Sequence, residues 1–287
     1  MASFRYFRYF VLLAVLLSSG VRGPLLAEKE TLPEQRLRQI VARQKEILEQ
    51  AAKQGDNVDE ESVRAQIQEI CDAYELLLHD SPKFATAYAS YGYLLSKIDM
   101  RKEASAMLLK ANQIDPDIPL VKNQLGNYLA EEGRPIEAIN YFLAAIKLEP
   151  NEPLYHYQLG KLLYAARDDF LKKGIYTRPQ LDQAMHEAFR RAAELAPDRI
   201  EFNYRYAESF YDLEKPDWDE ALKAWAGLEE KAPTAIERQT MRLHAANILI
   251  KQGKWAHARL LLDTVSEPDL AGQKQKLVAQ LPENAKK

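Results

Sequence analysis

Residues 119–152 read PLVKNQLGNYLAEEGRPIEAINYFLAAIKLEPNE, and this stretch decides the fold. In each half, small or apolar residues recur three or four positions apart: Leu125, Gly126 and Leu129, then Ala138, Phe142 and Ala145. Because positions three and four apart share one face of a helix, each half is predicted to be a helix. Gly133 lies between the halves and can adopt the left-handed conformation that ends a helix. The stretch therefore predicts a helix hairpin.

The same pattern returns along the chain with a period of 34 residues. Small or kinking residues carry the period: Gly92, Gly126 and Gly160; Pro82, Pro116 and Pro150; Ala104 and Ala138; Ala111 and Ala145. A glycine or alanine lets the two helices approach closely, where a larger side chain would strain the packing. A proline ends the second helix because it cannot continue the hydrogen-bond ladder. Such a period is typical of a solenoid, in which each hairpin packs on its neighbours.

The order of these residues resembles the repeat of the tetratricopeptide repeat family, most clearly between Leu125 and Pro150. The resemblance covers residues 31–281. It implies an all-α fold, a right-handed α-solenoid of about six helix hairpins with a C-terminal capping helix. Regular repeats are expected at 85–118 and 119–152, an extended repeat at 153–199, degenerate repeats at 31–84, 200–235 and 236–267, and the cap at 268–281. We expect residues 28–287 to form one continuous solenoid without an internal boundary.

The repeat at 153–199 departs from the period. The proline expected 34 residues after Pro150 stands 47 residues after it, at Pro197, so 13 residues are added between the two helices. The segment 168–174 is predicted to extend the first helix, and Thr177 with Gln180 to open the second as a capping box. We expect this hairpin to protrude, either as a second docking surface or as an insertion tolerated at a hairpin tip.

Residues 1–27 are predicted to be a signal peptide. Arg5 and Arg8 give a basic start, residues 9–17 are an unbroken apolar run, and small residues follow up to Gly20. Nine apolar residues are too few to span a bilayer comfortably, and an uncleaved N-terminal anchor is the alternative. The resemblance favours a bacterial envelope. We therefore expect an exported protein in the periplasm or another extracytoplasmic compartment, membrane-associated through residues 1–27 if these are retained.

The composition gives no sign of catalysis, of a metal site or of nucleic-acid binding. The net charge is −3 with both signs mixed, so there is no basic footprint for nucleic acid. The five histidines lack the spacings of zinc sites, and no glycine-rich phosphate loop or Gly-x-Ser-x-Gly elbow is present. The single cysteine, Cys71, lies on an apolar helical face and is expected to be buried. We predict a protein that is not an enzyme and uses no cofactor.

The resemblance also implies a ligand-binding surface. In this family the first helix of each hairpin, helix A, lines the concave side of the stack. The helix A residues that packing does not use are expected to face that groove: Tyr93, Lys97, Asn123, Asn127, Glu131, Tyr157, Lys161, Tyr164, Tyr204, Glu208, Tyr211 and Asn247. Asparagine amides can bond a peptide backbone, and tyrosines give a large contact area with few rotors to freeze. The alternative is that the tyrosines only fill gaps between helices.

These features favour a non-enzymatic scaffold in the cell envelope that holds a protein or peptide in its groove. One alternative is a membrane-anchored assembly factor for an envelope complex. Another is a glycan-binding or enzyme-accessory module, suggested by the groove tyrosines. Some relatives hold a C-terminal carboxylate with a Lys/Asn/Arg clamp, but the matching positions here do not supply that set.

Overall fold

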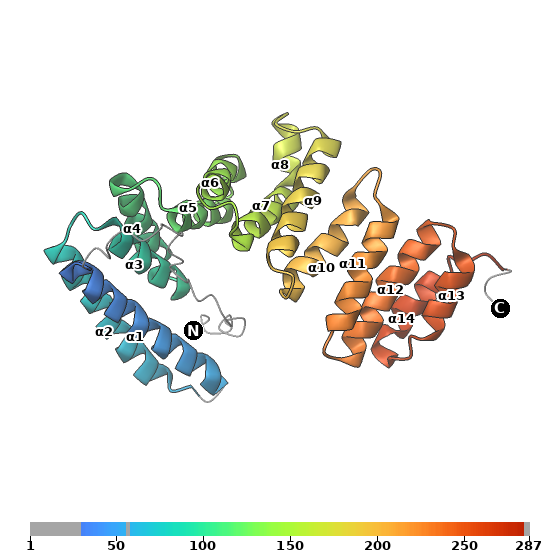
Figure 1. Ribbon diagram of the computed structural model, residues 1–287, viewed down its shortest axis with the longest axis horizontal. Helices are drawn as coiled ribbons and strands as arrows, with labels where there is room; N and C mark the ends of the chain where they lie inside the picture. Colours follow the sequence, from blue (N-terminus) through green and yellow to red (C-terminus); the bar gives the residue numbers. More distant parts are fainter. Residues whose placement is uncertain (1–29, 56–57, 284–287) are drawn as a thin grey trace, which may run out of the picture. The chain divides into compact units, whose positions relative to one another are not determined.

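The computed structural model describes residues 30–55 and 58–283, and these residues form α-helices joined by short turns, with no β-strand among them (Figure 1). The elements are α1 (Leu32–Gln54), α2 (Glu60–Asp80), α3 (Ala85–Lys97), α4 (Arg101–Ile114), α5 (Pro119–Glu131), α6 (Pro135–Leu148), α7 (Pro153–Ala165), α8 (Arg167–Lys172), α9 (Arg178–Leu195), α10 (Ile200–Ser209), the 3₁₀ helix η3 (Phe210–Asp212), α11 (Trp218–Lys231), α12 (Ala235–Lys251), α13 (Trp255–Asp263), the 3₁₀ helix η4 (Pro268–Leu270) and α14 (Ala271–Val278). In these residues no helix is both long enough and apolar enough to cross a membrane. The predicted signal peptide lies outside the described residues.

Helices that follow one another in the chain pack as hairpins, which confirms the predicted α-solenoid. The pairs α1 and α2, α3 and α4, α7 and α9, and α12 and α13 are each in contact. Within each unit, neighbouring hairpins are also in contact, as α2 is with α3, α9 with α10, and α11 with α12. Figure 1 shows α9, α10, α11 and α12 side by side in chain order.

The chain divides into two compact units, and each is described by itself. Unit 1 ends at Gln124 and unit 2 begins at Leu125. The sequence analysis expected no internal boundary, whereas this division falls inside α5. A stack of hairpins has no central core, because each hairpin packs only on its neighbours, so such a stack can divide along its length. The apolar clusters follow it: one surrounds Tyr74 in unit 1, and others surround Phe189 and Trp225 in unit 2.

The glycines of the 34-residue period lie at close helix contacts. A Cβ atom at Gly126 would stand 3.0 Å from the Phe142 ring, and one at Gly160 would stand 2.7 Å from the Phe189 ring. At Gly92 the distance is 2.9 Å, to a leucine side chain of α4. Real Cβ atoms essentially never approach a neighbour more closely than 3.0 Å. The predicted packing reason for these glycines is therefore confirmed.

Capping boxes and left-handed residues set the ends of several helices. The boxes predicted at Thr31 and Thr177 are both present, and a third, which the sequence analysis did not identify, opens α12 at Thr234. Each box satisfies backbone donors that the first helical turn leaves without a partner. Gly133 adopts a φ of 73° in the turn between α5 and α6, as predicted.

The extended hairpin differs from its predicted form. The first helix ends at Ala165, and α8 is a separate short helix rather than its continuation. Gly174, with a φ of 66°, then turns the chain toward α9. The Arg167 guanidinium lies 3.1 Å from a carboxylate oxygen of Asp182 on α9 and 2.9 Å from one of Asp212 in η3. These largely buried ion pairs attach the inserted residues to the second helix of the same hairpin, through Asp182, and to the next hairpin, through Asp212.

The last described helix covers the end of unit 2. Leu277 and Val278 at the end of α14 pack against the apolar cluster that contains Leu262 and Leu270. Leu281 is also buried in this cluster. The segment expected to be a cap therefore protects the last hairpin, although its helix is shorter than predicted because η4 precedes it.

Candidate functional site

Unit 2 brings predicted binding residues of three hairpins into one connected surface. The helices that carry them are α7, α10 with η3, and α12, each the first helix of its hairpin. The surface consists of Tyr164, Tyr204, Arg205, Tyr211, His244 and Asn247, which we call the helix A row.

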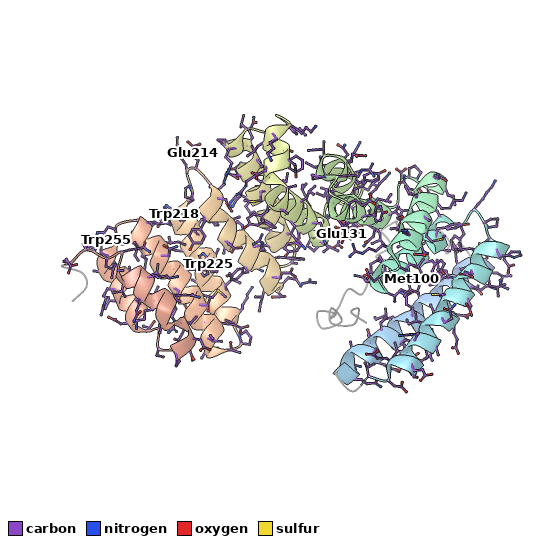
Figure 2. The ribbon with its side chains drawn as sticks, turned by 180° about the vertical axis from the view of Figure 1, so that it is seen from behind. Met100, Glu131, Glu214, Trp218, Trp225 and Trp255 are labelled. Atoms are coloured by element: carbon purple, nitrogen blue, oxygen red, sulfur yellow. The ribbon has the colours of Figure 1, made fainter. Side chains whose placement is uncertain are left out.

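His244 links the tyrosines of the fifth hairpin to the sixth. The Tyr204 hydroxyl lies 3.4 Å from His244 Nε2, and the Tyr211 hydroxyl lies 3.3 Å from His244 Nδ1. The Tyr211 hydroxyl also donates to the His244 carbonyl oxygen at 3.2 Å. This arrangement suits a neutral ring whose Nδ1–H donates to Tyr211 and whose Nε2 accepts from Tyr204. The ring stacks on Trp225, labelled in Figure 2, with centroids 3.9 Å apart and an interplanar angle of 1°.

Burial sets the charge states of this cluster. It lowers the pKa of His244 to about 4, because the charged ring is disfavoured beside apolar neighbours. It also raises the pKa of Tyr211 to about 12, against a smaller opposing effect from a hydrogen bond with Asn247. At neutral pH the cluster is therefore uncharged, and the tyrosines keep their donor protons.

A stacked arginine links the fourth hairpin to the fifth. The Arg205 guanidinium of α10 lies 4.6 Å from the centroid of the Tyr164 ring on α7. Arg205 also pairs with the Glu208 carboxylate one turn along α10. A guanidinium over an aromatic face is attracted by the ring electrons. Tyr164 remains 45 % exposed, so a large aromatic surface stays open to solvent and to a partner.

Tyr157 does not have the exposed position that the sequence analysis expected. It is 6 % exposed, its ring lies 4.5 Å from that of Phe202, and its hydroxyl donates to Glu201 at 2.5 Å. The residue therefore packs between the fourth and fifth hairpins, as the gap-filling alternative proposed. Lys161 is exposed one turn later, with its ammonium 5.6 Å from the Tyr157 ring centroid.

The predicted residues of unit 1 are more buried than expected. Asn123 is completely buried, and its side-chain amide makes no hydrogen bond with any described residue. Tyr93 and Lys97 are half-buried, and the Lys97 ammonium lies 4.9 Å from the Tyr93 ring centroid. Burial lowers the pKa of Lys97 and raises that of Tyr93. Asn123 is thus a buried residue and not an open ligand contact.

The remaining predicted residues are accessible. Asn127 and Asn247 are half-buried, and Glu131 is exposed. Asn127 and Glu131 belong to the part of α5 that lies in unit 2. Their place in a concave groove and their role in binding stay predictions.

The sequence analysis missed two members of the helix A row, Arg205 and His244. It considered histidines only as metal ligands or catalytic groups. A signal was nevertheless present, because His244 stands one turn before the predicted Asn247, and Arg205 stands three residues before Glu208. Positions three and four apart share a helix face, so both fall beside residues that had been chosen.

The next observations concern metal-binding and catalytic side chains among the described residues. They contain no group of His, Cys, Asp and Glu side chains that could hold a metal ion. Ser209 and His186 are in contact at 2.8 Å, but both are buried and the serine hydroxyl donates to the Tyr206 carbonyl. Cys71 is buried, as expected.

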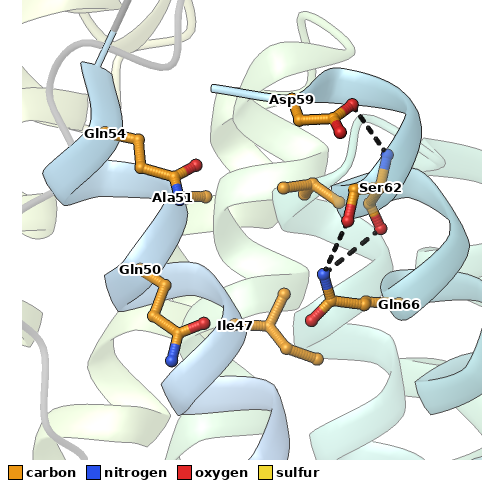
Figure 3. A pocket seen from close by; sticks show the side chains of 8 residues that line it. Ile47, Gln50, Ala51, Gln54, Asp59, Ser62 and Gln66 are labelled. Atoms are coloured by element: carbon orange, nitrogen blue, oxygen red, sulfur yellow. Dashed lines mark hydrogen bonds between the residues drawn. The ribbon is translucent and has the colours of Figure 1, made fainter. Parts of the chain in front are cut away.

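A small cavity lies between α1 and α2 (Figure 3). Its volume is about 70 Å³, well below the roughly 300 Å³ at which ligand pockets begin. Gln66 and Asp59, which line it, already bond Ser62 within the same helix end. We therefore place no site in this cavity.

Comparisons with known proteins agree with this architecture. Residues 85–118 and 121–152 each match the family model described as tetratricopeptide repeat. A TPR repeat-containing protein of Treponema pallidum (strain Nichols) is 27% identical over 146 residues, which is 51% of this chain and 18% of that protein. The chain therefore spans less than a fifth of the length of this relative.

Solved structures with the same fold cover most of the chain. YrrB, a TPR protein with an unusual peptide-binding site, matches with a TM-score of 0.59 and 19% identity over 72% of this chain and 97% of YrrB. PilF of Pseudomonas aeruginosa matches with a TM-score of 0.56 and 15% identity over 86% of this chain and 97% of PilF. PilW, a widely conserved type IV pilus biogenesis factor, matches with a TM-score of 0.53 and 13% identity over 87% of this chain and 99% of PilW. At these identities the likeness shows the fold. With its repeated hairpins, close glycine contacts and two matched segments, the chain is an α-solenoid that contains tetratricopeptide repeats.

Proposed function

We propose that this protein is a non-enzymatic scaffold that binds a peptide segment of a partner protein across the helix A row of unit 2. The tetratricopeptide repeat fold is a scaffold for protein–protein interaction, and the proposal assigns the contact to particular residues. YrrB offers a precedent for peptide binding within the same fold.

One observation carries the proposal: the row is continuous over three hairpins and yet partly open. Arg205 connects α7 to α10, and His244 connects α10 and η3 to α12. Tyr164 stays 45 % exposed at one end, where an aromatic face can pack on a partner side chain. The half-buried Asn247 at the other end offers both a donor and an acceptor to a peptide backbone.

A crosslinking experiment tests this proposal in the native host. A photoreactive amino acid placed at Tyr164 should crosslink a partner, whereas the same probe at Lys223, exposed on α11, should not. The partner is then identified by mass spectrometry, and its affinity for the purified chain is measured. Tyr164→Ala with Asn247→Ala should weaken that affinity at least about tenfold, or about 1.4 kcal/mol, and Tyr164→Ala alone should weaken it with an unchanged melting temperature. Full-strength binding by this variant would contradict the assignment.

We further propose that the protein acts outside the cytoplasm, in the cell envelope. The support comes from sequence: Arg5, Arg8 and the apolar run at 9–17 have the arrangement of a signal peptide. A reporter fused after Lys29 should be exported. A reporter that stays in the cytosol would contradict the proposal.

The membrane-anchored assembly factor is the second candidate. It differs from the first in the fate of the N-terminal segment, because only an uncleaved segment can act as an anchor. Sequencing the N-terminus of the mature protein separates the two: a chain that still begins at Met1 supports the anchored form, and a chain that begins near residue 20 or later supports the exported scaffold.

A further inference from the structure

A larger cleft opens in unit 1, between α2, α3 and α4. Its volume is about 500 Å³, which falls within the usual range of ligand sites. It belongs to a different unit from the helix A row and is lined by different helices, so it does not form part of the surface proposed above.

Apolar and aromatic side chains form most of this cleft. The cleft is lined by Leu78 on α2, Tyr88 and Leu95 on α3, and Met107 on α4. Of these, Leu95 is almost fully buried. Met100, labelled in Figure 2, lines the cleft from the turn between α3 and α4. It is 40 % exposed although it is apolar. Methionine side chains are flexible and polarisable, and they adapt to apolar partners of varied shape.

The charged groups of the cleft are carboxylates. Glu75 on α2 accepts a hydrogen bond from the Tyr91 hydroxyl at 3.1 Å, and Glu103 on α4 lines the cleft from the opposite helix. The lining also contains His79, but neither Lys nor Arg. Arg101, which precedes Glu103 by two residues, bonds Asp99 at 2.9 Å, so its charge is already paired. An apolar guest with a cation at its edge would therefore meet complementary charge.

We propose that this cleft binds an amphipathic helix of a partner protein, with the apolar face of that helix against Met100 and Met107 and a Lys or Arg at its edge between Glu75 and Glu103. A helix laid in an apolar groove is a common mode of recognition, in which anchors three and four residues apart fill the groove. The flanking carboxylates then select basic helices over acidic ones, because like charges repel and a desolvated carboxylate needs a partner.

A binding measurement with the full chain tests this proposal. The probe is a fluorescein-labelled amphipathic helix of about 18 residues made of Leu and Lys, and its counterpart replaces each Lys with Glu. Fluorescence anisotropy should show the Leu/Lys peptide binding at least about tenfold more tightly than the Leu/Glu peptide. Glu75→Gln with Glu103→Gln should weaken the Leu/Lys peptide at least about fivefold, and Met107→Lys should abolish its binding.

A matched control separates the cleft from general charge attraction. Glu69→Gln with Glu230→Gln changes the net charge by the same amount at exposed positions outside the lining, and it should leave the affinity unchanged. Equal losses in the two double variants would overturn the proposal. Tyr164→Ala with Asn247→Ala should also bind the Leu/Lys peptide normally, so failure here is distinguishable from failure of the proposed function.

Two other occupants would also overturn the proposal. If a chain that lacks residues 1–29 binds the Leu/Lys peptide more tightly than the full chain, the occupant is the N-terminal segment of this protein. If the full chain self-associates and Met107→Lys alone abolishes the self-association, the occupant is a second copy. Unchanged affinity in the truncated chain and a monomeric full chain would support an external partner.

Discussion

Acidification should destabilise unit 2 through His244. The buried ring stacks on Trp225, and burial lowers its pKa from 6.5 to about 4. In the unfolded chain the ring binds a proton near its ordinary pKa, whereas in the folded protein it does so only near the lowered value. Between these two values the unfolded state carries more protons, so the free energy of unfolding decreases as the pH falls.

The size of the effect follows from the two pKa values. The contribution of His244 is complete above the ordinary value of about 6.5 and falls by about 2 kcal/mol between pH 8 and pH 5. Burial also lowers the pKa of His186, which therefore destabilises the folded state in the same direction on acidification. A variant at His244 isolates the contribution of this residue to the pH dependence. His186 is present in both proteins, so its contribution cancels when the two free energies of unfolding are subtracted.

His244→Phe removes the titrating group and keeps an aromatic ring that can stack on Trp225. Urea unfolding followed by tryptophan fluorescence reports on unit 2, because the three tryptophans, Trp218, Trp225 and Trp255, all lie there. The free energy of unfolding of the wild type minus that of the variant should fall by about 2 kcal/mol from pH 8 to pH 5. A difference that stays constant over this range would show that His244 titrates as an ordinary exposed histidine, and it would refute the argument.

Three further predictions concern packing and can be checked by thermal or urea unfolding. Gly160→Ala should destabilise unit 2 by about 1–3 kcal/mol because its Cβ would overlap a phenylalanine ring, whereas Gly227→Ala, which has open space at that position, should not destabilise it. Tyr157→Phe should cost about 0.5–1.5 kcal/mol for its lost hydrogen bond, and an unaltered stability would show that the hydroxyl is solvated. Asp182→Ala should cost about 3 kcal/mol because it leaves a largely buried arginine partly unpaired, while Arg190→Ala, in an exposed pair, should cost under about 1 kcal/mol.

The repeat determines what could be predicted of the fold. Gly92, Gly126 and Gly160 recur at 34-residue intervals, and each lies where a Cβ atom would collide with a side chain of the paired helix. The capping boxes at Thr31 and Thr177 are equally local, because four consecutive residues decide them. Features that depend on one or two helical turns were therefore open to prediction from sequence.

Contacts between hairpins were not open to the same reasoning. Tyr157 lies on the same helix as Tyr164, yet one is buried and the other exposed. The difference arises because Phe202 and Glu201 of the next hairpin reach Tyr157, which helical periodicity within α7 does not reveal. The division at Gln124 lies inside α5, and the regular 34-residue period, which marks each repeat alike, does not predict it.

Under the proposed function, the helix A row is a binding surface whose side chains are ordered before a partner arrives. Arg205 holds the ring of Tyr164, and His244 holds both Tyr204 and Tyr211, so each side chain is ordered by one from a neighbouring hairpin. Side chains that are already ordered have less rotamer freedom to lose when a partner arrives, which favours binding.

The same contacts couple binding to stability in the middle of the row. A change at Tyr204, Tyr211 or His244 removes hydrogen bonds between hairpins. Weaker binding by such a variant would therefore not distinguish a lost ligand contact from weaker packing of the hairpins. Tyr164 is different, because it is substantially exposed and its ring packs against arginine side chains. Asn247 stands at the opposite end and is half-buried, but it shares a hydrogen bond with Tyr211 of the neighbouring hairpin. Binding and folding are therefore best separated at Tyr164, which is why the proposed function is tested first at Tyr164 and not at the central tyrosines.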